Sequence, residues 1–197
     1  ILNFDFDDWH PAFHSLAQYL ITQLWHSAAA VSLAQILFTT GVFAYGMHTL
    51  KQQGAPKYLL FFLTLLFAIH PLHGAYSITL WKDIPFSVSL LWLSILLVRI
   101  ATTEGRWLKR WQNLLLLTVV LTLTFFFRHN GFAPVLATLL GLFILYLRRF
   151  LQTAAVTMAL IGIILFIRGP LFQKLEVKTD PPRHALPGYI YPMAGHI

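Results

Sequence analysis

The chain has no cysteine, few charged residues and half as many acidic as basic residues. Without cysteine it can form neither a disulfide nor a thiolate metal site. Aspartate, glutamate, lysine and arginine make up 11% of its 197 residues, against roughly 25% in a typical soluble domain, whereas 57% are hydrophobic. This composition excludes an ordinary soluble domain and indicates a membrane protein. The sequence also shows no signal peptide, internal repeat or low-complexity tract.

Long apolar segments account for most of the chain. They cover residues 27–50, 58–72, 84–98, 114–127, 131–147 and 150–167. A spanning helix needs about 20 mostly apolar residues, and about 17 at the lower limit, so several of these segments are short. We therefore predict an all-α, polytopic transmembrane protein with about six spans and a transmembrane domain at 27–168. Residues 169–197 are expected to be an extracytoplasmic loop or the start of an outer domain, in a fragment of a longer protein.

A short helix is predicted before the first span. Pro11 suits the first position of a helix, and Phe13, Leu16 and Leu20 follow it at helical spacing. The segment 11–24 is too short to cross a bilayer. We expect it to lie in the outer membrane interface as an amphipathic helix, within a first extracytoplasmic loop at 1–26.

The charged residues alternate between two kinds of connection. The connections at 51–57, 99–113 and 148–149 carry eight cations and a single acid, Glu104, whereas the remaining connections carry six acids and six cations. The positive-inside rule assigns the basic connections to the cytoplasm, and the mixed connections are then extracytoplasmic. Because the cations flank apolar segments, the net charge of +7 favours contact with lipid headgroups, and we expect no nucleic acid as a partner.

The strongest candidate site is the acidic segment before Pro11. Asp5, Asp7 and Asp8 lie within four residues, His10 stands two positions after Asp8, and His14 comes one helical turn later. Clustered carboxylates suit either a general base or a divalent metal as a cofactor. The alternative is a short, solvated acidic loop without a chemical role.

The second candidate is Trp81-Lys82-Asp83 at the outer start of a span. Lys82 is predicted to bind a phosphate at membrane level, with Asp83 orienting it. The alternative is a local ion pair at a helix start, where an aspartate is favoured by the helix dipole.

The third candidate is the outer turn formed by Arg128, His129, Asn130 and Gly131. An arginine on the less basic side of the membrane indicates a partner, which would be Asp83, an acid of the first loop or an anionic ligand. The alternative is that the segment is only a tight turn, for which Asn-Gly is well suited.

Other polar residues have structural interpretations. His70 and His73 could join His10 and His14 around a metal, but their spacing matches no closed zinc site, so an interfacial histidine pair is favoured. Inside the apolar segment 27–50, Gln35 and its neighbours Thr39 and Thr40 are predicted to form hydrogen bonds between helices.

Three motifs carry a resemblance to a known superfamily: Asp8-Trp9-His10-Pro11, Trp81-Lys82-Asp83-Ile84-Pro85 and Arg128-His129-Asn130-Gly131. The chain resembles the GT-C integral-membrane glycosyltransferases, relatives of protein O-mannosyltransferases and lipid A aminoarabinose transferases. It looks most like bacterial members with an Asp-Trp-His-Pro motif. The resemblance implies location in the bacterial plasma membrane, an extracytoplasmic active site, a polyprenyl-phosphate sugar donor, inverting transfer and an essential carboxylate in the first outer loop.

The expected function is therefore sugar transfer to an acceptor that the sequence does not identify. Asp8, or after it Asp7 or Asp5, would be the general base, unless that carboxylate lies upstream of Ile1. His10 and His14 would position the loop and the acceptor, while Lys82 and Arg128 would stabilise the departing lipid phosphate. The alternatives are a transporter or flippase of an anionic lipid or sugar, and a non-catalytic scaffold. Charges gathered at the span ends favour surface chemistry over transport.

Overall fold

The structure is a computed structural model that describes residues 12–174, and every regular element in this range is helical. The helices are α1 (Ala12–Leu24), α2 (Ala28–Gln52), α3 (Lys57–Ile69), α4 (Pro71–Ile78), α5 (Asp83–Thr102), α6 (Trp111–Phe127), α7 (Phe132–Leu145), α8 (Phe150–Phe166) and α9 (Phe172–Lys174). Three 3₁₀ turns, η1 (Arg106–Lys109), η2 (His129–Gly131) and η3 (Leu147–Arg149), and a π-helical turn, η4 (Ile167–Leu171), connect some of them. The all-α prediction is confirmed for the described residues.

The helix starts follow from local chemistry. Ser27 has extended backbone angles, and its hydroxyl accepts the N–H of Ala29, which caps α2. At the break between α3 and α4, the ring Nδ1 of His70 accepts the N–H of Leu72, and Pro71 takes the first helical position. The sequence prediction of one segment over 58–72 is therefore wrong at its end, because Pro71 stops α3 and starts a new helix.

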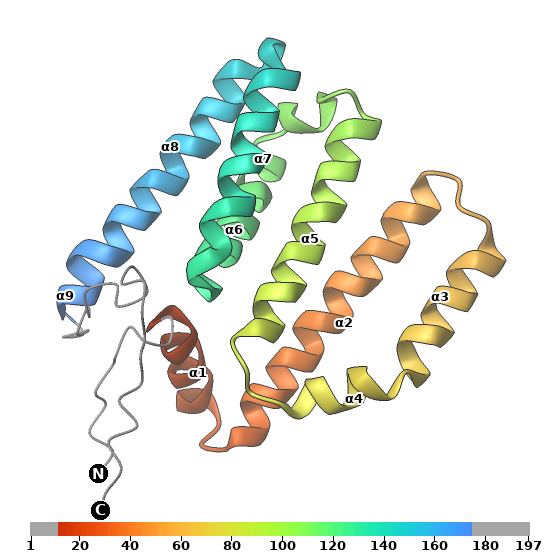
Figure 1. Cartoon of the computed structure of the whole chain (residues 1–197), viewed down its shortest axis with the longest axis vertical. Coiled ribbons are helices and arrows are strands. Elements are labelled where there is room, and N and C mark those ends of the chain that lie inside the picture. Colours follow the sequence, from red (N-terminus) through yellow and green to blue (C-terminus); the bar gives the residue numbers. More distant parts are fainter. Residues whose placement is uncertain (1–11, 175–197) are drawn as a thin grey trace, which may run out of the picture.

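The long helices run up and down, so their connections gather at two ends (Figure 1). The connections after α2, α5 and α7 lie at one end, which we call the basic end. The opposite end holds α1, α4, the segment 79–82 and the turn η2, and we call it the mixed end. This arrangement agrees with the alternation of charge predicted from the sequence.

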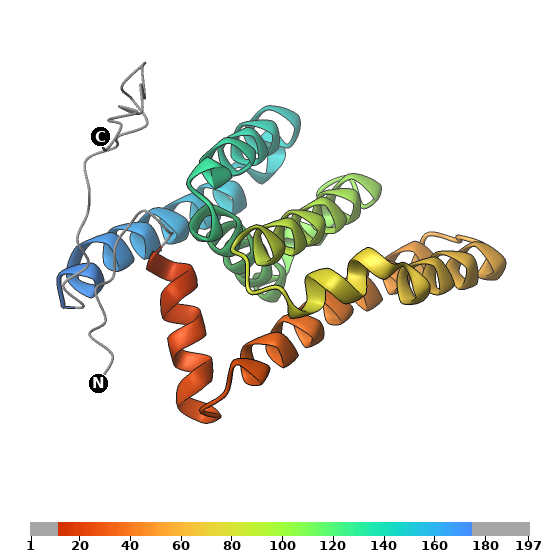
Figure 2. The same ribbon diagram turned by 60° about the horizontal axis from the view of Figure 1, so that its bottom comes forward.

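The core lies where α5, α6 and α8 pack together. Leu96 of α5, Leu117 and Leu121 of α6, and Val156 of α8 are all at most 1% exposed. On one side of this core α2 packs beside α5, and α2, α3 and α4 together form an arm whose outer part is α3 and α4 (Figures 1 and 2). In keeping with that position, α3 has no buried residue.

Three helical segments are long and apolar enough to cross a membrane: Ala28–Gln52, Asp83–Thr102 and Leu147–Lys174. Three more apolar helices, Lys57–Ile69, Trp111–Phe127 and His129–Leu145, are shorter. A helix of 13 residues such as α3 spans about 20 Å at 1.5 Å per residue, whereas the hydrocarbon core is about 30 Å thick. The helices thus support a membrane protein with at least three segments of spanning length among the described residues.

Candidate functional site

The segment between α4 and α5 carries Lys82 and is held in place by two glutamines. Gln35, which is only 8% exposed, donates its Nε2 to the carbonyl oxygens of Tyr76 at 2.8 Å and Thr79 at 3.1 Å. From α1, Gln18 donates to the carbonyl of Leu80 at 3.5 Å. Hydrogen bonds from side-chain amides to backbone carbonyl groups help to fix the backbone of a connection. Two different helices thus determine where the α5 start and its charged residues lie.

An ion pair joins the start of α5 to the turn after α6. The Nη1 atom of Arg128 lies 3.3 Å from Oδ1 of Asp83, and the guanidinium also lies over the ring of Phe86, 5.7 Å from its centroid. Both side chains of the pair remain about two-fifths exposed (43% and 41%). The Oδ1 atom itself is shielded from solvent, and its contact with Arg128 lacks hydrogen-bond geometry. Asp83 is one of the partners predicted for Arg128.

The turn after α6 depends on a close approach of two backbone segments. Gly131 has φ −62° and ψ −19°, which any residue adopts. A Cβ atom there would overlap the carbonyl oxygen of Thr124 and lie 3.1 Å from the Cα of Phe125. The Asn-Gly turn predicted from the sequence is present, but its glycine is needed because a side chain would not fit and not because of a special backbone conformation.

A cavity of about 420 Å³ brings several predicted residues together at the mixed end. Its lining includes His14, Gln18, Trp81, Lys82 and Asp83, from α1 and the α4–α5 connection. The Nε2 atoms of His14 and Gln18 lie 2.9 Å apart, as in a hydrogen bond from the amide to the ring. The cavity therefore offers a cation, a carboxylate and an imidazole from segments almost seventy residues apart in sequence.

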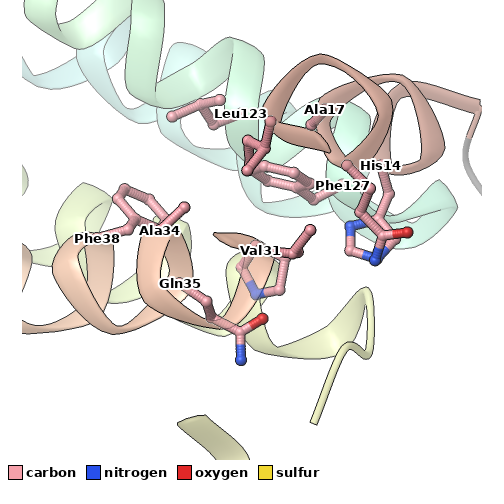
Figure 3. Close-up of a pocket in the computed structure, with 11 residues that line it drawn as sticks. His14, Ala17, Val31, Ala34, Gln35, Phe38, Leu123 and Phe127 are labelled. Carbon is pink, nitrogen blue, oxygen red and sulfur yellow. The ribbon is translucent and has the colours of Figure 1, made fainter. Parts of the chain in front are cut away.

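A second, apolar cavity of about 260 Å³ lies between α1, α2 and α6, with Pro85 of α5 also in its lining (Figure 3). His14 and Phe127 point into it from opposite helices, and their rings meet edge to face with centroids 6.2 Å apart. Val31 and Phe38 line it from α2. His14 thus lines both cavities, which places its ring at the boundary between polar and apolar space.

A third hollow is a groove of about 520 Å³ between the α2–α3–α4 arm and α5. Its walls include Phe67 of α3, Tyr76 of α4 and Leu91 of α5, and its lining reaches Trp81 and Asp83. Most of the side chains that line it are apolar. The groove therefore runs from mostly apolar walls to the charged start of α5.

Several predicted site residues lie elsewhere. His129 and Asn130 are exposed in η2 and line none of these three cavities. Asp5, Asp7, Asp8 and His10 lie outside the described residues, so their candidate roles rest on the sequence alone.

The histidines and the polar residues of α2 have mainly structural contacts. His70 caps α4, as described above, and its ring centroid lies 5.5 Å from that of His73, so the two form a pair as favoured from the sequence. Within residues 12–174 no three His, Asp or Glu side chains are close enough to hold a metal together. Gln35 does form the predicted hydrogen bonds to another helix and its flank, whereas Thr39 donates to the carbonyl of Gln35 within α2.

The comparisons with known proteins find one family. A family of unknown function (DUF6020) matches residues 9–175, which include every described residue. No curated protein and no solved structure matches the chain.

Proposed function

The chain belongs to the DUF6020 family, whose function is unknown, and we propose that it is a membrane glycosyltransferase. It would move a sugar from a polyprenyl-phosphate donor to an extracytoplasmic acceptor. One observation carries this proposal: the charged start of α5, with Lys82, Asp83 and its partner Arg128, adjoins both a polar cavity and an apolar groove. An amphiphilic ligand with an anionic head and a long apolar chain matches that combination.

The ion pair at the start of α5 is suited to binding rather than to holding the fold. Salt bridges between exposed side chains contribute about 0–1 kcal/mol to stability, and both Arg128 and Asp83 are about two-fifths exposed. A phosphate that recruited Arg128 would therefore disturb the fold little. Asp83, which lines the groove, and Phe86 meanwhile hold the guanidinium beside the start of α5, so that it is oriented before the donor arrives.

In the proposed reaction, the acceptor hydroxyl attacks the anomeric carbon of the sugar, and the bond from that carbon to the phosphate oxygen breaks. The acceptor's proton passes to a first-loop carboxylate, for which Asp8 is favoured, with Asp7 and Asp5 as the next candidates. Polyprenyl phosphate leaves with the bonding electrons, and the charge that develops on it is stabilised by Lys82 and Arg128. No metal is required by these steps, although the carboxylates of the first loop could hold a divalent one.

The proposal includes an orientation. Placing the basic end in the cytoplasm satisfies the positive-inside rule, and the mixed end then faces the extracytoplasmic side of a bacterial plasma membrane. The three shorter apolar helices would complete about six passes, with α1 in the outer interface. Helices shorter than the bilayer core are accommodated by local thinning and by flanking residues that reach the interface.

The test measures release of polyprenyl phosphate from a panel of polyprenyl-phosphate sugars, in membranes that contain the full-length protein. This product is common to all acceptors, so the acceptor need not be known. Lys82→Ala and Arg128→Ala should each slow release by about 10- to 150-fold, because a hydrogen bond to a charged group contributes about 1.5–3 kcal/mol. Arg128→Lys should restore little if the contact is bidentate. Lys51→Ala removes a cation at the basic end and serves as the matched control.

The outcomes separate the proposal from its alternatives. Asp8→Asn should lower the rate by at least about tenfold while donor binding persists, as expected for a general base. Transbilayer movement of the lipid without release of polyprenyl phosphate would favour a flippase instead. Unchanged release in both alanine variants would leave Lys82 and Arg128 with a structural role only and refute the proposed phosphate contacts.

A further inference from the structure

The basic end contains a cavity of its own, unrelated to the proposed sugar transfer. It measures about 520 Å³ and lies between the α5–α6 connection and the α7–α8 connection. Arg106 and Glu104 line it from the first connection, and Arg148 and Arg149 line it from the second. Residues more than forty positions apart in sequence therefore bring three guanidinium groups and one carboxylate around one space.

A tight packing contact fixes the two connections against each other. Gly105 has φ +73°, a conformation that favours glycine. A Cβ atom at this position would lie only 2.7 Å from Cδ1 of Tyr146, which also lines the cavity. The glycine thus lets the α5–α6 connection lie directly on the tyrosine ring. This contact holds the two connections together, so the arginines that line the cavity come from segments packed against each other and not from separate loops.

The backbone next to this contact is strained. Glu104 has φ +51°, the one non-glycine residue within 12–174 with a positive φ. Such a conformation is unfavourable for a residue with a side chain and is retained where the surrounding structure requires it. Here the conformation of Glu104 places the next residue, Gly105, against the ring of Tyr146. Backbone outliers of this kind occur often at functional sites.

The arginines retain most of their donors for a ligand. Arg106 uses its Nε to donate to the carbonyl of Thr103 at 3.2 Å, and its terminal nitrogens have no partner among the described residues. The side chains of Arg148 and Arg149 make no hydrogen bond or ion pair within residues 12–174. Glu104 forms no ion pair with any of them. Unpaired guanidinium groups from two connections suit a phosphate, which accepts paired hydrogen bonds from arginine.

We propose that this cavity binds the phosphate of an anionic lipid headgroup at the membrane surface. Ile144, Leu145 and Leu147 also line it, and each is at least 70% exposed. Exposed apolar residues beside arginines would contact the acyl chains while the arginines hold the phosphate. The formal charge of the lining is +2, from three arginines and one glutamate, which matches an anionic phosphate group. A soluble phosphate would share the same arginines but would leave the apolar residues without a partner.

The test measures lipid binding by the intact protein in detergent, by native mass spectrometry with phosphatidic acid, phosphatidylglycerol and phosphatidylcholine as separate probes. The double variant Arg106→Gln/Arg148→Gln should lower the affinity for the two anionic lipids by at least about tenfold, since hydrogen bonds to charged groups are involved. The matched control is Lys109→Gln/Arg110→Gln, which removes two cations of the same connection that do not line the cavity. The control should bind these lipids as the unaltered protein does.

Each outcome decides the question. Inorganic phosphate is added in a competition arm, and displacement of the lipid at millimolar concentration would assign the cavity to soluble phosphate instead. Equal losses in the cavity variant and the control would reduce the effect to general surface charge and overturn the proposal, as would unchanged binding in the cavity variant. Since the readout is binding and the residues lie at the basic end, the result is independent of whether the mixed end transfers sugar.

Discussion

Gly131→Ala is the substitution whose effect follows most directly from the structure. The added methyl group would overlap the carbonyl oxygen of Thr124, a residue that is completely buried. The obstacle is backbone at the end of α6, so it cannot be relieved by a rotamer change. The turn η2 must move away from α6, and Arg128 moves with it.

The loss of stability in Gly131→Ala can be bounded from the kind of atoms that would clash. Overpacking of a close-packed site costs about 1–3 kcal/mol, and a backbone obstacle belongs at the upper end of that range. Because Gly131 already has φ −62°, alanine brings no conformational strain that would add to this cost. For a chain of this size about 1 kcal/mol corresponds to 2–4 °C, so the unfolding midpoint should fall by about 4–12 °C.

The assay is thermal unfolding of the purified protein in detergent, with Gly141→Ala as the matched control. A Cβ at Gly141 meets nothing within 4 Å, and the residue lies inside α7, where alanine is favoured over glycine by about 1 kcal/mol. The control should therefore keep or raise the midpoint. Equal midpoints for both variants would show that η2 does not approach α6 as closely as described, and the position assigned to Arg128 would be unsupported.

Three further predictions concern the mixed end and the orientation. Gln35→Leu removes the hydrogen bonds to Tyr76 and Thr79. At 0.5–1.5 kcal/mol for each bond, it should cost about 1–3 kcal/mol of stability in the same unfolding assay. No change in stability would mean that other contacts hold the α4–α5 connection. Asp83→Asn should cost at most about 1 kcal/mol because its ion pair is exposed, yet it should slow release of polyprenyl phosphate; a large loss of stability would identify the pair as structural. Since the chain has no cysteine, single cysteines introduced at Gln53 and Gln173 can report the two sides of the membrane. An impermeant thiol reagent added to intact cells should label only the cysteine at position 173. Equal labelling of both positions would contradict the proposed orientation.

The sequence predicted the helices well because apolar runs and their charged connections are local signals. The predicted helix is confirmed over residues 12–24, and the described connections lie at two ends as the charge pattern predicts. The break at His70-Pro71 was missed although proline disfavours helix in the residue before it. The continuous apolar run over 58–72 favoured a single segment, although Pro71 is a signal for a helix break.

The contacts that shape the candidate site could not be read from the sequence. Gln35 was assigned a bond between helices, but its acceptors lie 41 and 44 residues away, and no periodicity identifies them. The pair of Arg128 with Asp83 was one of three options for that arginine, and only the arrangement of α5 and α6 distinguishes them. Gln18 approaches the α4–α5 connection from α1, and its acceptor, the carbonyl of Leu80, lies 62 residues away in the sequence.

The two walls of the apolar groove are held with different strength, and this difference bears on how a lipid could reach the charged start of α5. The α5 wall belongs to the core: Leu93, on the same helix as the groove residue Leu91, is 2% exposed. The opposite wall is formed by α3 and α4, and α3 has no buried residue. Its ties to α2 include the stacked rings of Phe43 and Phe67, with centroids 3.9 Å apart, and the hydrogen bonds of Gln35. Regions with few buried contacts open at low free-energy cost. We therefore expect the α3–α4 wall to move away from the groove more readily than α5, which keeps Asp83 and Phe86 in contact with Arg128.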